Sequence, residues 1–391
     1  AIHKVDVPAS WSNPEADPAP KELAGRPELV KQIRDVMEPI ARMDGDSLPV
    51  SAFVANANGE WEQGASAYEK RGTAVNVPEW DASKCVGCNQ CAFVCSHATI
   101  RPFQLTADEL AAAPAQTKSR DNKPANEYKF VMAVSPLDCM GCGECVTVCP
   151  TAAIEMKPQE SQADQQAAFD YCVENIRKKD NIPGVVSEVS VKGSQFNQPL
   201  LEFSGSCAGC AETSYARLIT QLFGEKMFIS NATGCSSIWG GTASISPYTT
   251  NKESGFGPAW INSLFEDNAE HGLGMQIGYE TVRANLITKV EALKGKNADL
   301  DAVIDKYLET KNNTKANDAP AKALIAALEA CGCDEAKEIL KDKQYLAKKS
   351  FWIFGGDGWA YDIGYGGLDH VLASGHDVNV MVFDTEMYSN T

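Results

Sequence analysis

Two matching groups of four cysteines constrain this chain more than any other feature of its sequence. The first is Cys85-Val-Gly-Cys88-Asn-Gln-Cys91-Ala-Phe-Val-Cys95, and the second is Cys139-Met-Gly-Cys142-Gly-Glu-Cys145-Val-Thr-Val-Cys149-Pro150. Both follow the spacing C-x2-C-x2-C-x3-C, in which three close thiolates bind one four-iron cluster and the fourth binds its neighbour. We therefore predict one domain that holds two four-iron clusters.

The same spacing predicts that the ligands cross between the two groups. Cluster 1 is assigned to Cys85, Cys88, Cys91 and Cys149, and cluster 2 to Cys139, Cys142, Cys145 and Cys95. Zinc is the alternative metal, but a zinc site takes four ligands in one tetrahedron and does not need this spacing. The first group ends in Cys95-Ser96, where the second has Cys149-Pro150, and the ligand geometry does not depend on that proline.

A third group of cysteines lies further along the chain. Cys207-Ala-Gly-Cys210 is followed by Cys235, which gives three soft ligands and needs a fourth from elsewhere. From the residues alone, a structural or redox C-x2-C pair and a cluster are both open. Cys172, Cys331 and Cys333 lie in no metal-binding motif, and we interpret Cys331-Gly-Cys333 as a pair of incidental thiols.

The end of the chain predicts a parallel βαβ unit. An apolar strand at Phe351–Phe354 leads into the turn Gly356-Asp357-Gly358, a helix from about Ile363 to Ala373, and a strand at Val378–Phe383. Asp384-Thr385-Glu386-Met387-Tyr388-Ser389-Asn390 follows. Loops at the carboxyl edge of a parallel sheet converge on one crevice, where a carboxylate, a hydroxyl and a carbonyl could hold magnesium beside a diphosphate. The alternative is an ordinary structural turn.

Composition excludes several classes of function. The 35 Lys and Arg against 52 Asp and Glu give a net charge of −17, which disfavours nucleic acid as a partner. Apolar runs fall short of the roughly 20 residues that a membrane span needs. Cysteines clustered for metal binding indicate a reducing cytoplasm. The chain starts without methionine at Ala1 and ends at Thr391 in what we expect to be a ligand loop, so we interpret it as a fragment.

Shifts in composition divide the chain into segments. We expect a Pro-rich connector at 1–21, a small linking domain at 22–62, the two-cluster domain at 63–180, and an incomplete domain at 181–391. A stretch rich in Ala, Lys, Glu and Leu at 279–349 predicts a helical insertion in the last domain. The predicted fold is therefore multidomain, with α+β and α/β parts, and its last domain is built on a parallel sheet.

Together, these motifs resemble the pyruvate:ferredoxin oxidoreductase family. The resemblance rests on the two cysteine groups, Ser206-Cys-Ala-Gly-Cys-Ala-Glu212, Asn231-Ala-Thr-Gly-Cys235-Ser-Ser, and Gly355-Gly-Asp357-Gly-Trp359. It implies that 1–21 ends a coenzyme A domain, that the two-cluster domain is ferredoxin-like, and that 181–391 binds thiamine diphosphate. A third four-iron cluster would use Cys207, Cys210 and Cys235, with a fourth ligand beyond Thr391.

The resemblance also implies roles for individual residues at the cofactor end. Asp357, Thr385 and the carbonyl of Met387 would bind magnesium, although the wider thiamine-diphosphate motif has Asn where this chain has Thr385. Asn390 is the one residue we assign a catalytic role. The residues expected to contact thiamine diphosphate are Glu212, Cys235, Gly356, Asp357, Gly358, Trp359, Thr385, Glu386, Met387, Tyr388, Ser389 and Asn390.

The activity implied by the resemblance is oxidative decarboxylation of pyruvate with coenzyme A to acetyl-CoA and CO2. Thiamine diphosphate serves as the electron sink, and because each cluster accepts one electron, the oxidation proceeds in two single-electron steps. The implied partners are ferredoxin or flavodoxin, and the implied assembly is a homodimer. Two alternatives remain: an oxidoreductase for another 2-oxoacid, and a polyferredoxin that only carries electrons.

Overall fold

The computed structural model describes Lys4 and residues 6–12, 23–123, 127–179, 189–241, 245–295 and 297–387. The chain divides into two compact units, Ala1–Val54 and Ala55–Thr391. In the first unit, α1 (Pro27–Gln32), η2 (Ile33–Met37) and α2 (Glu38–Ala41) follow one another directly. Leu29, Ile33, Val36 and Met37 recur at helical spacing and are buried, whereas Ile40, at the same spacing, is 41% exposed.

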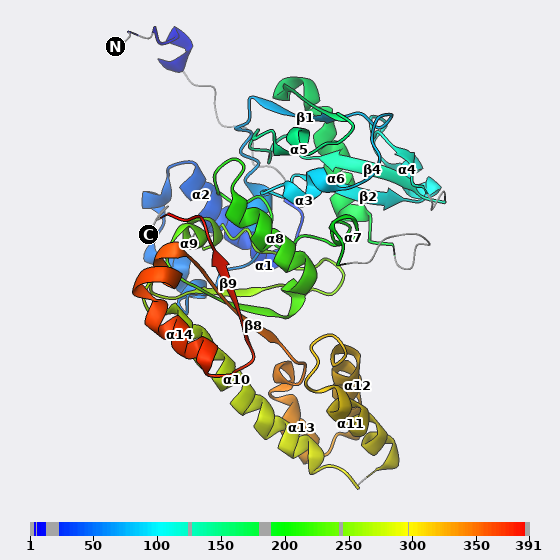
Figure 1. Cartoon of the computed structure of the whole chain (residues 1–391), viewed down its shortest axis with the longest axis vertical. Coiled ribbons are helices and arrows are strands. Elements are labelled where there is room, and N and C mark those ends of the chain that lie inside the picture. Colours follow the sequence, from blue (N-terminus) through cyan, green and yellow to red (C-terminus); the bar gives the residue numbers. More distant parts are fainter. Residues whose placement is uncertain are drawn as a thin grey trace. The chain divides into compact units, whose positions relative to one another are not determined.

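The cysteine groups lie in an α+β domain of the second unit, as predicted. Two antiparallel sheets carry the domain, one of order β1-β5 and one of order β2-β4-β3 (Figure 1). The strands are β1 (Asn76–Trp80), β2 (Ile100–Leu105), β3 (Arg120–Asp121), β4 (Lys129–Val134) and β5 (Ile154–Pro158). The helices are α3 (Gln90–Val94), α4 (Ala107–Ala112), α5 (Glu144–Thr147) and α6 (Asp164–Asn175), and η6 (Gln159–Gln162) precedes α6.

Strand β4 separates two small apolar cores. Phe130, Met132 and Val134 point to the side that holds the cysteine groups, whereas Val131 and Ala133 pack with Phe169 and Cys172 of α6. This alternation follows from the two-residue period of a β-strand. The cysteine groups are therefore covered by apolar side chains from one face of β4.

The following domain contains a parallel four-stranded sheet of order β7-β6-β8-β9, which confirms the predicted fold class. Its strands are β6 (Met227–Asn231), β7 (Ala259–Asn262), β8 (Ser350–Gly356) and β9 (Val378–Phe383). The helices beside it are α7 (Val191–Ser194), α8 (Ala211–Phe223), α9 (Cys235–Gly240), α10 (Asn268–Glu291), η9 (Trp359–Ile363) and α14 (Tyr365–Ala373). Ile353 packs with residues of α10 and α14, while its neighbour Phe354 packs with residues of α8 and α9, so helices cover both faces.

Helices α11 (Ala298–Thr310), α12 (Asp318–Cys331) and α13 (Asp334–Leu340) form a separate bundle at the far end of α10 (Figure 1). This bundle has its own core, which includes Leu286, Ile304, Tyr307 and Leu324. Within the described part of the chain, no helix combines the length and the apolar character that crossing a bilayer requires.

Candidate functional site

The two cysteine groups occupy equivalent positions in an internal repeat. Cys85 and Cys139 lie 54 residues apart, and the same offset relates α3 to α5 and β2 to β5. The residue before each short helix has a positive φ, 63° at Asn89 and 81° at Gly143. The repeat seen in the sequence is therefore also a repeat of backbone conformation.

Backbone N–H groups donate to the first and the last cysteine sulfur of each group. The donors are Gly87 to Cys85 (3.3 Å), Gly141 to Cys139 (3.4 Å), Thr99 to Cys95 (3.4 Å) and Ala153 to Cys149 (3.2 Å). Such bonds stabilise a thiolate over a thiol. Gly141 is constrained further, because its φ is 71° and an added Cβ would lie 3.0 Å from the Asn76 carbonyl oxygen.

Cys95 lies close to the first three cysteines of the second group. Burial raises the pKa of Cys139 to about 12 and also raises the pKa of Cys142 and Cys145, and the charge of Cys95 adds to each shift. Buried thiols such as Cys139 and Cys145 ionise at neutral pH only beside a compensating cation, such as the iron of a cluster. The donor set therefore fits a cluster, and the placement of Cys95 supports the crossed assignment.

The first group is arranged in a similar way. Burial raises the pKa of Cys91 well above its usual value, and the charges of Cys145, Cys85 and Cys88 raise it further. Cys85 and Cys149 pack against the apolar cluster that contains Cys91. In the described ranges, no three Cys, His, Asp or Glu side chains converge on a single-ion site, whereas in a four-iron cube each thiolate binds its own iron. The assignment to cluster 1 remains a prediction.

The third cysteine group lies beside the second one. An added Cβ on Gly209 would lie 3.4 Å from the Cβ of Cys142, so the turn between Cys207 and Cys210 packs against that loop. The hydroxyl of Ser96 also donates to the Cys210 carbonyl at 2.7 Å. Cys207 is exposed, and Cys235 is the first residue of α9. A third cluster on these residues remains a prediction.

The predicted magnesium ligands are drawn together at the carboxyl ends of β8 and β9. The Thr385 N–H and hydroxyl donate to the Asp357 carboxylate at 2.9 and 2.6 Å, and the hydroxyl lies 3.2 Å from the Met387 carbonyl oxygen. Although burial acts in the other direction, these bonds from Thr385 lower the pKa of Asp357. A carboxylate, a hydroxyl and a carbonyl are hard oxygen donors of the kind that magnesium prefers.

A cavity of about 480 Å³ adjoins this group. It is lined by Asp357, Tyr361, Asp362, Asp384, Glu386 and Met387. A larger cavity of about 980 Å³ lies elsewhere and is lined by none of the predicted site residues. We take the smaller cavity as the candidate cofactor site, because the hard oxygen donors converge there.

Several other residues predicted to contact the cofactor do not line this cavity, among them Glu212 and Trp359. Glu212 is buried, which raises its pKa, and its carboxylate accepts a hydrogen bond from the Trp239 indole at 3.0 Å. Trp359 is fully buried among Ile353, Leu368 and Val371, so it already has a packing role. Gly356 ends β8, and Gly358 precedes η9. Tyr388, Ser389 and Asn390 lie outside the described residues.

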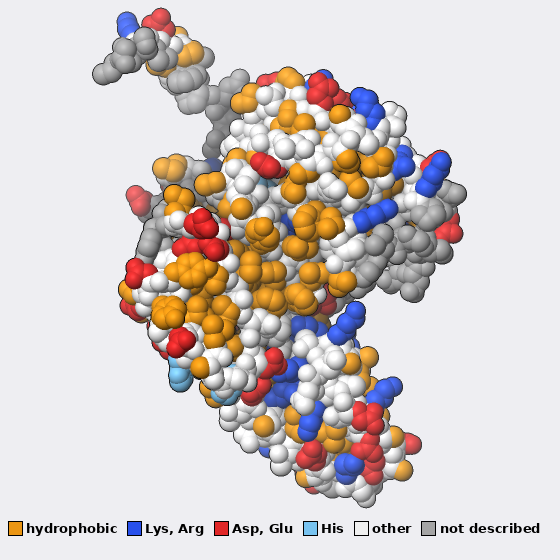
Figure 2. Space-filling view, viewed as in Figure 1, with side chains coloured by type: hydrophobic (Ala, Val, Ile, Leu, Met, Phe, Trp, Pro, Cys, Tyr) orange, Lys and Arg blue, Asp and Glu red, His pale blue; other side chains and the backbone are white. Residues whose placement is uncertain are grey.

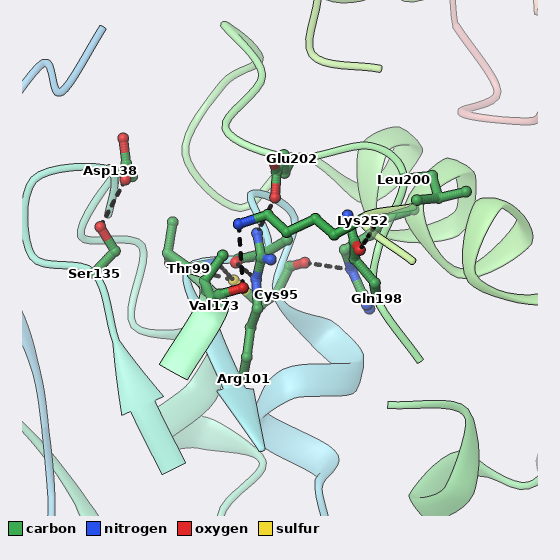
Figure 3. A network of polar contacts seen from close by, with 12 residues as sticks. Cys95, Thr99, Arg101, Ser135, Asp138, Val173, Gln198, Leu200, Glu202 and Lys252 are labelled. Atoms are coloured by element: carbon green, nitrogen blue, oxygen red, sulfur yellow. Dashed lines mark hydrogen bonds and ion pairs between the residues drawn. The ribbon is translucent and has the colours of Figure 1, made fainter. Parts of the chain in front are cut away.

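A buried ion pair, which no sequence motif predicts, joins the ferredoxin-like domain to the domain that follows. The Arg101 guanidinium pairs with the Glu202 carboxylate, and both side chains are under 10% exposed. Arg101 also lies over the rings of Phe169 and Phe203. Figure 3 shows this pair beside Lys252, which donates to the Val173 carbonyl, and close to Cys95 and Thr99. The ion pair thus fixes β2, which follows Cys95, against the next domain.

Comparisons with known proteins identify the domain that carries the two cysteine groups and the relatives of the whole chain. Residues 84–153 match the family model described as a 4Fe-4S dicluster domain, and residues 15–74 match a domain of unknown function. A pyruvate-flavodoxin oxidoreductase of Klebsiella pneumoniae is 48% identical over all of this chain, which covers 33% of that protein. The pyruvate:ferredoxin oxidoreductase of Moorella thermoacetica is 47% identical, with 34% of it covered. The chain is a homologue of part of these oxidoreductases.

The relatives also include a longer protein with a different named acceptor. The mitochondrial pyruvate dehydrogenase [NADP(+)] of Euglena gracilis is 43% identical over 99% of this chain, which covers 21% of that protein. This chain spans about a third of the length of the first two relatives. The predicted family resemblance and the ferredoxin-like domain are therefore confirmed.

Proposed function

We propose that this chain is part of an enzyme that oxidises pyruvate with coenzyme A to acetyl-CoA and CO2 and passes the electrons to ferredoxin or flavodoxin. One observation carries the proposal. The same chain joins two matched cysteine groups to a parallel sheet on which Asp357, Thr385 and the Met387 carbonyl converge. A pure electron carrier has no use for that oxygen cluster.

Thiamine diphosphate, when bound, supplies an electron sink for the decarboxylation. In our proposal the chain's own residues hold that cofactor through magnesium. Asp357 provides a charge, and Thr385 and Met387 provide neutral oxygens, which leaves further positions for phosphate oxygens and water. The buried Glu212 carboxylate, which Trp239 fixes, would contact the cofactor from the start of α8.

Electron transfer is supported by the positions of the three cysteine groups, because the second group lies close to both the third and the first. Cys210 precedes α8 in the domain of the parallel sheet, while its turn packs against Cys142 of the second group. Cys145 of that group is close to Cys91 of the first. A third cluster on Cys207, Cys210 and Cys235 would therefore accept electrons first and pass them to clusters 2 and 1.

The proposed assembly is a cytoplasmic homodimer, away from membranes. Apolar side chains are exposed over α9, η9 and α14 (Figure 2), namely Ile238, Tyr361, Ile363, Tyr365 and Leu372. A face of this kind is typical of a surface that another chain covers, and we propose that a second copy covers it. Sedimentation of the full-length protein at several concentrations tests the dimer, and a concentration-independent monomer would contradict it.

Full-length protein purified without oxygen tests the proposed function. We expect three cubes, about twelve irons, and one thiamine diphosphate per subunit, with thiamine diphosphate lost when magnesium is chelated. Iron without any retained thiamine diphosphate would support the polyferredoxin alternative. Coenzyme A-dependent reduction of ferredoxin should be faster with pyruvate than with 2-oxoglutarate or an aryl pyruvate, and the reverse order would support another 2-oxoacid.

A further inference from the structure

Arg217 is a charged side chain placed entirely inside the protein. It lies on α8, two turns after Cys210, and only 1% of its surface is exposed. Burial lowers the pKa of its guanidinium to about 10, against the opposing effect of the negative charge of Cys95. Arg217 therefore stays positively charged at neutral pH.

The guanidinium of Arg217 reaches across from α8 into the ferredoxin-like domain. Its Nε donates to the Cys95 carbonyl at 2.9 Å, and one terminal nitrogen donates to the Phe93 carbonyl at the end of α3. The other terminal nitrogen donates to the side-chain oxygens of Gln195 and Gln221, at 2.9 and 2.7 Å. These bonds fix the chain at Cys95 to the helix that begins after Cys210.

All four acceptors of Arg217 are neutral amides or carbonyls. Within the described residues, no carboxylate pairs with it, in contrast to the nearby Arg101, which Glu202 neutralises. Taking an uncompensated charge out of water is unfavourable unless another charge opposes it. Cys95, whose carbonyl accepts from the Arg217 Nε at 2.9 Å, would supply that negative charge as a cluster thiolate.

Arg217 contacts only the first of the two repeated cysteine groups, among the described residues. The positions equivalent to Phe93 and Cys95 in the second group are Thr147 and Cys149. The Cys149 carbonyl accepts from the Ala152 N–H at 3.3 Å. No lysine or arginine donates to Thr147 or Cys149 in the part of the chain that the structure describes. Among the described residues, the two matched sites therefore differ by the buried positive charge of Arg217, whereas the half-buried Arg120 lies at the first group, where an added Cβ on Gly87 would be 3.1 Å from its guanidinium.

We propose that Arg217 is a positioning residue that raises the reduction potential of cluster 2, the cluster that Cys95 binds with Cys139, Cys142 and Cys145. When that cluster accepts one electron, it gains one negative charge, and a fixed positive charge nearby stabilises the reduced form more than the oxidised form. This inference rests on the proposed electron-transfer function. It makes the middle cluster of the path a better acceptor than its repeat partner.

The test is a redox titration of the full-length holoenzyme, followed by electron paramagnetic resonance. In Arg217→Gln, the ratio of reduced to oxidised cluster 2 at a fixed potential should fall at least tenfold, which equals 59 mV for one electron. The affected signal should be the one that Cys139→Ser abolishes. Arg217→Lys keeps the charge, so in this variant the ratio of reduced to oxidised cluster 2 should fall less than threefold. A cluster 2 signal in Arg217→Gln that titrates as in the wild type would overturn the proposal.

A second variant keeps the proposal testable if Arg217→Gln fails to fold or loses iron. Gln221→Glu leaves Arg217 in place and puts a carboxylate on its acceptor atom, so it should also lower the potential of cluster 2. An unchanged potential in Gln221→Glu, or an equal loss in Arg217→Lys and Arg217→Gln, would refute a role for the charge. If the wild type binds no cluster at all, the proposed function itself fails.

Arg283 offers a matched control. It is also a buried arginine, 6% exposed, and it donates to the backbone carbonyls of Lys311 and Leu346 in the helical bundle. Arg283→Gln should lower the thermal stability while every cluster potential stays at its wild-type value. A shift of cluster 2 in this variant as large as in Arg217→Gln would show a general effect of destabilisation and would overturn the proposal.

Discussion

The hydroxyl and the N–H of Thr385 both donate to the carboxylate of Asp357, although the two residues are 28 positions apart in the chain. The parallel sheet causes this contact, because each residue follows the end of a neighbouring strand, β8 or β9. The hydroxyl oxygen of Thr385 keeps lone pairs that can bind a cation. The pair therefore brings together two of the three proposed magnesium ligands.

Replacing Asp357 by Asn should abolish the magnesium-dependent binding of thiamine diphosphate. The amide oxygen can still accept the bonds from Thr385, so the fold should persist, but the only charged ligand of the proposed set is lost. Calorimetric titration of the full-length apoprotein with thiamine diphosphate and magnesium measures the effect, which should be at least tenfold in affinity.

Asp384→Asn is the control for this experiment. Asp384 lines the same cavity and accepts from the Tyr361 hydroxyl at 3.1 Å, but it is not among the proposed ligands. The affinity of the Asp384→Asn variant for thiamine diphosphate should stay within about threefold of the wild type. Removing a charge outside the ligand set should change the binding free energy by about 0.7 kcal/mol or less. Equal losses in both variants would argue against Asp357 as a ligand.

The crossed assignment predicts which cysteine variants resemble each other. Cys95→Ser should perturb the same cluster signal as Cys139→Ser, and Cys149→Ser should perturb the same signal as Cys85→Ser. Cys88→Ala should remove the absorption of cluster 1 and largely spare cluster 2. The measurement is electron paramagnetic resonance and iron content of anaerobically purified protein.

Cys172→Ala provides the matched control for these substitutions. Cys172 is fully buried on the α6 side of the sheet and belongs to neither group, so both cluster signals should persist. If Cys95→Ser instead affected the signal that Cys85→Ser affects, each group would bind its own cluster and the crossed assignment would be wrong.

Much of the fold could be predicted because its signals are local. Cysteine spacing predicts the ferredoxin-like domain, and the apolar run at Val378–Phe383 coincides with β9. The start of α10 was missed, since the expected helical stretch begins at Tyr279 and the helix begins at Asn268. The first part of α10 contains several glycines, which disfavour a helix in a sequence-based prediction. Gly272 fits the packing there, because an added Cβ would lie 2.5 Å from the Ile353 side chain.

The long-range charges could not be predicted. The partners of Arg217 on α3 are more than 120 positions away, and Glu202 is 101 positions from Arg101. No spacing rule connects residues that meet only after two domains have packed. The sequence therefore predicts which atoms bind metal, whereas the buried charges near them become visible only in the structure.

Breaking the Arg101–Glu202 pair should destabilise the contact between the two domains. Glu202→Gln leaves a buried guanidinium without its counter-charge, at a cost of about 3 kcal/mol. Hydrogen exchange of the β2 amides in the holoenzyme measures the opening free energy. Glu79→Gln, which removes the exposed pair with Lys118 on the same domain, should cost less than about 1 kcal/mol. Equal effects would contradict a special role for the buried pair.

The third cluster can be separated from the first two by comparing two exposed thiols. Cys207 and Cys331 are both exposed, but only Cys207 is in the proposed ligand set. Cys207→Ser should remove about four irons per subunit and leave the two ferredoxin-like signals in place. Cys331→Ser should remove none, because Cys331 lies in the helical bundle, where its sulfur is 2.8 Å from that of Cys333. A full iron content in Cys207→Ser would leave Cys207 and Cys210 as a C-x2-C pair without a cluster.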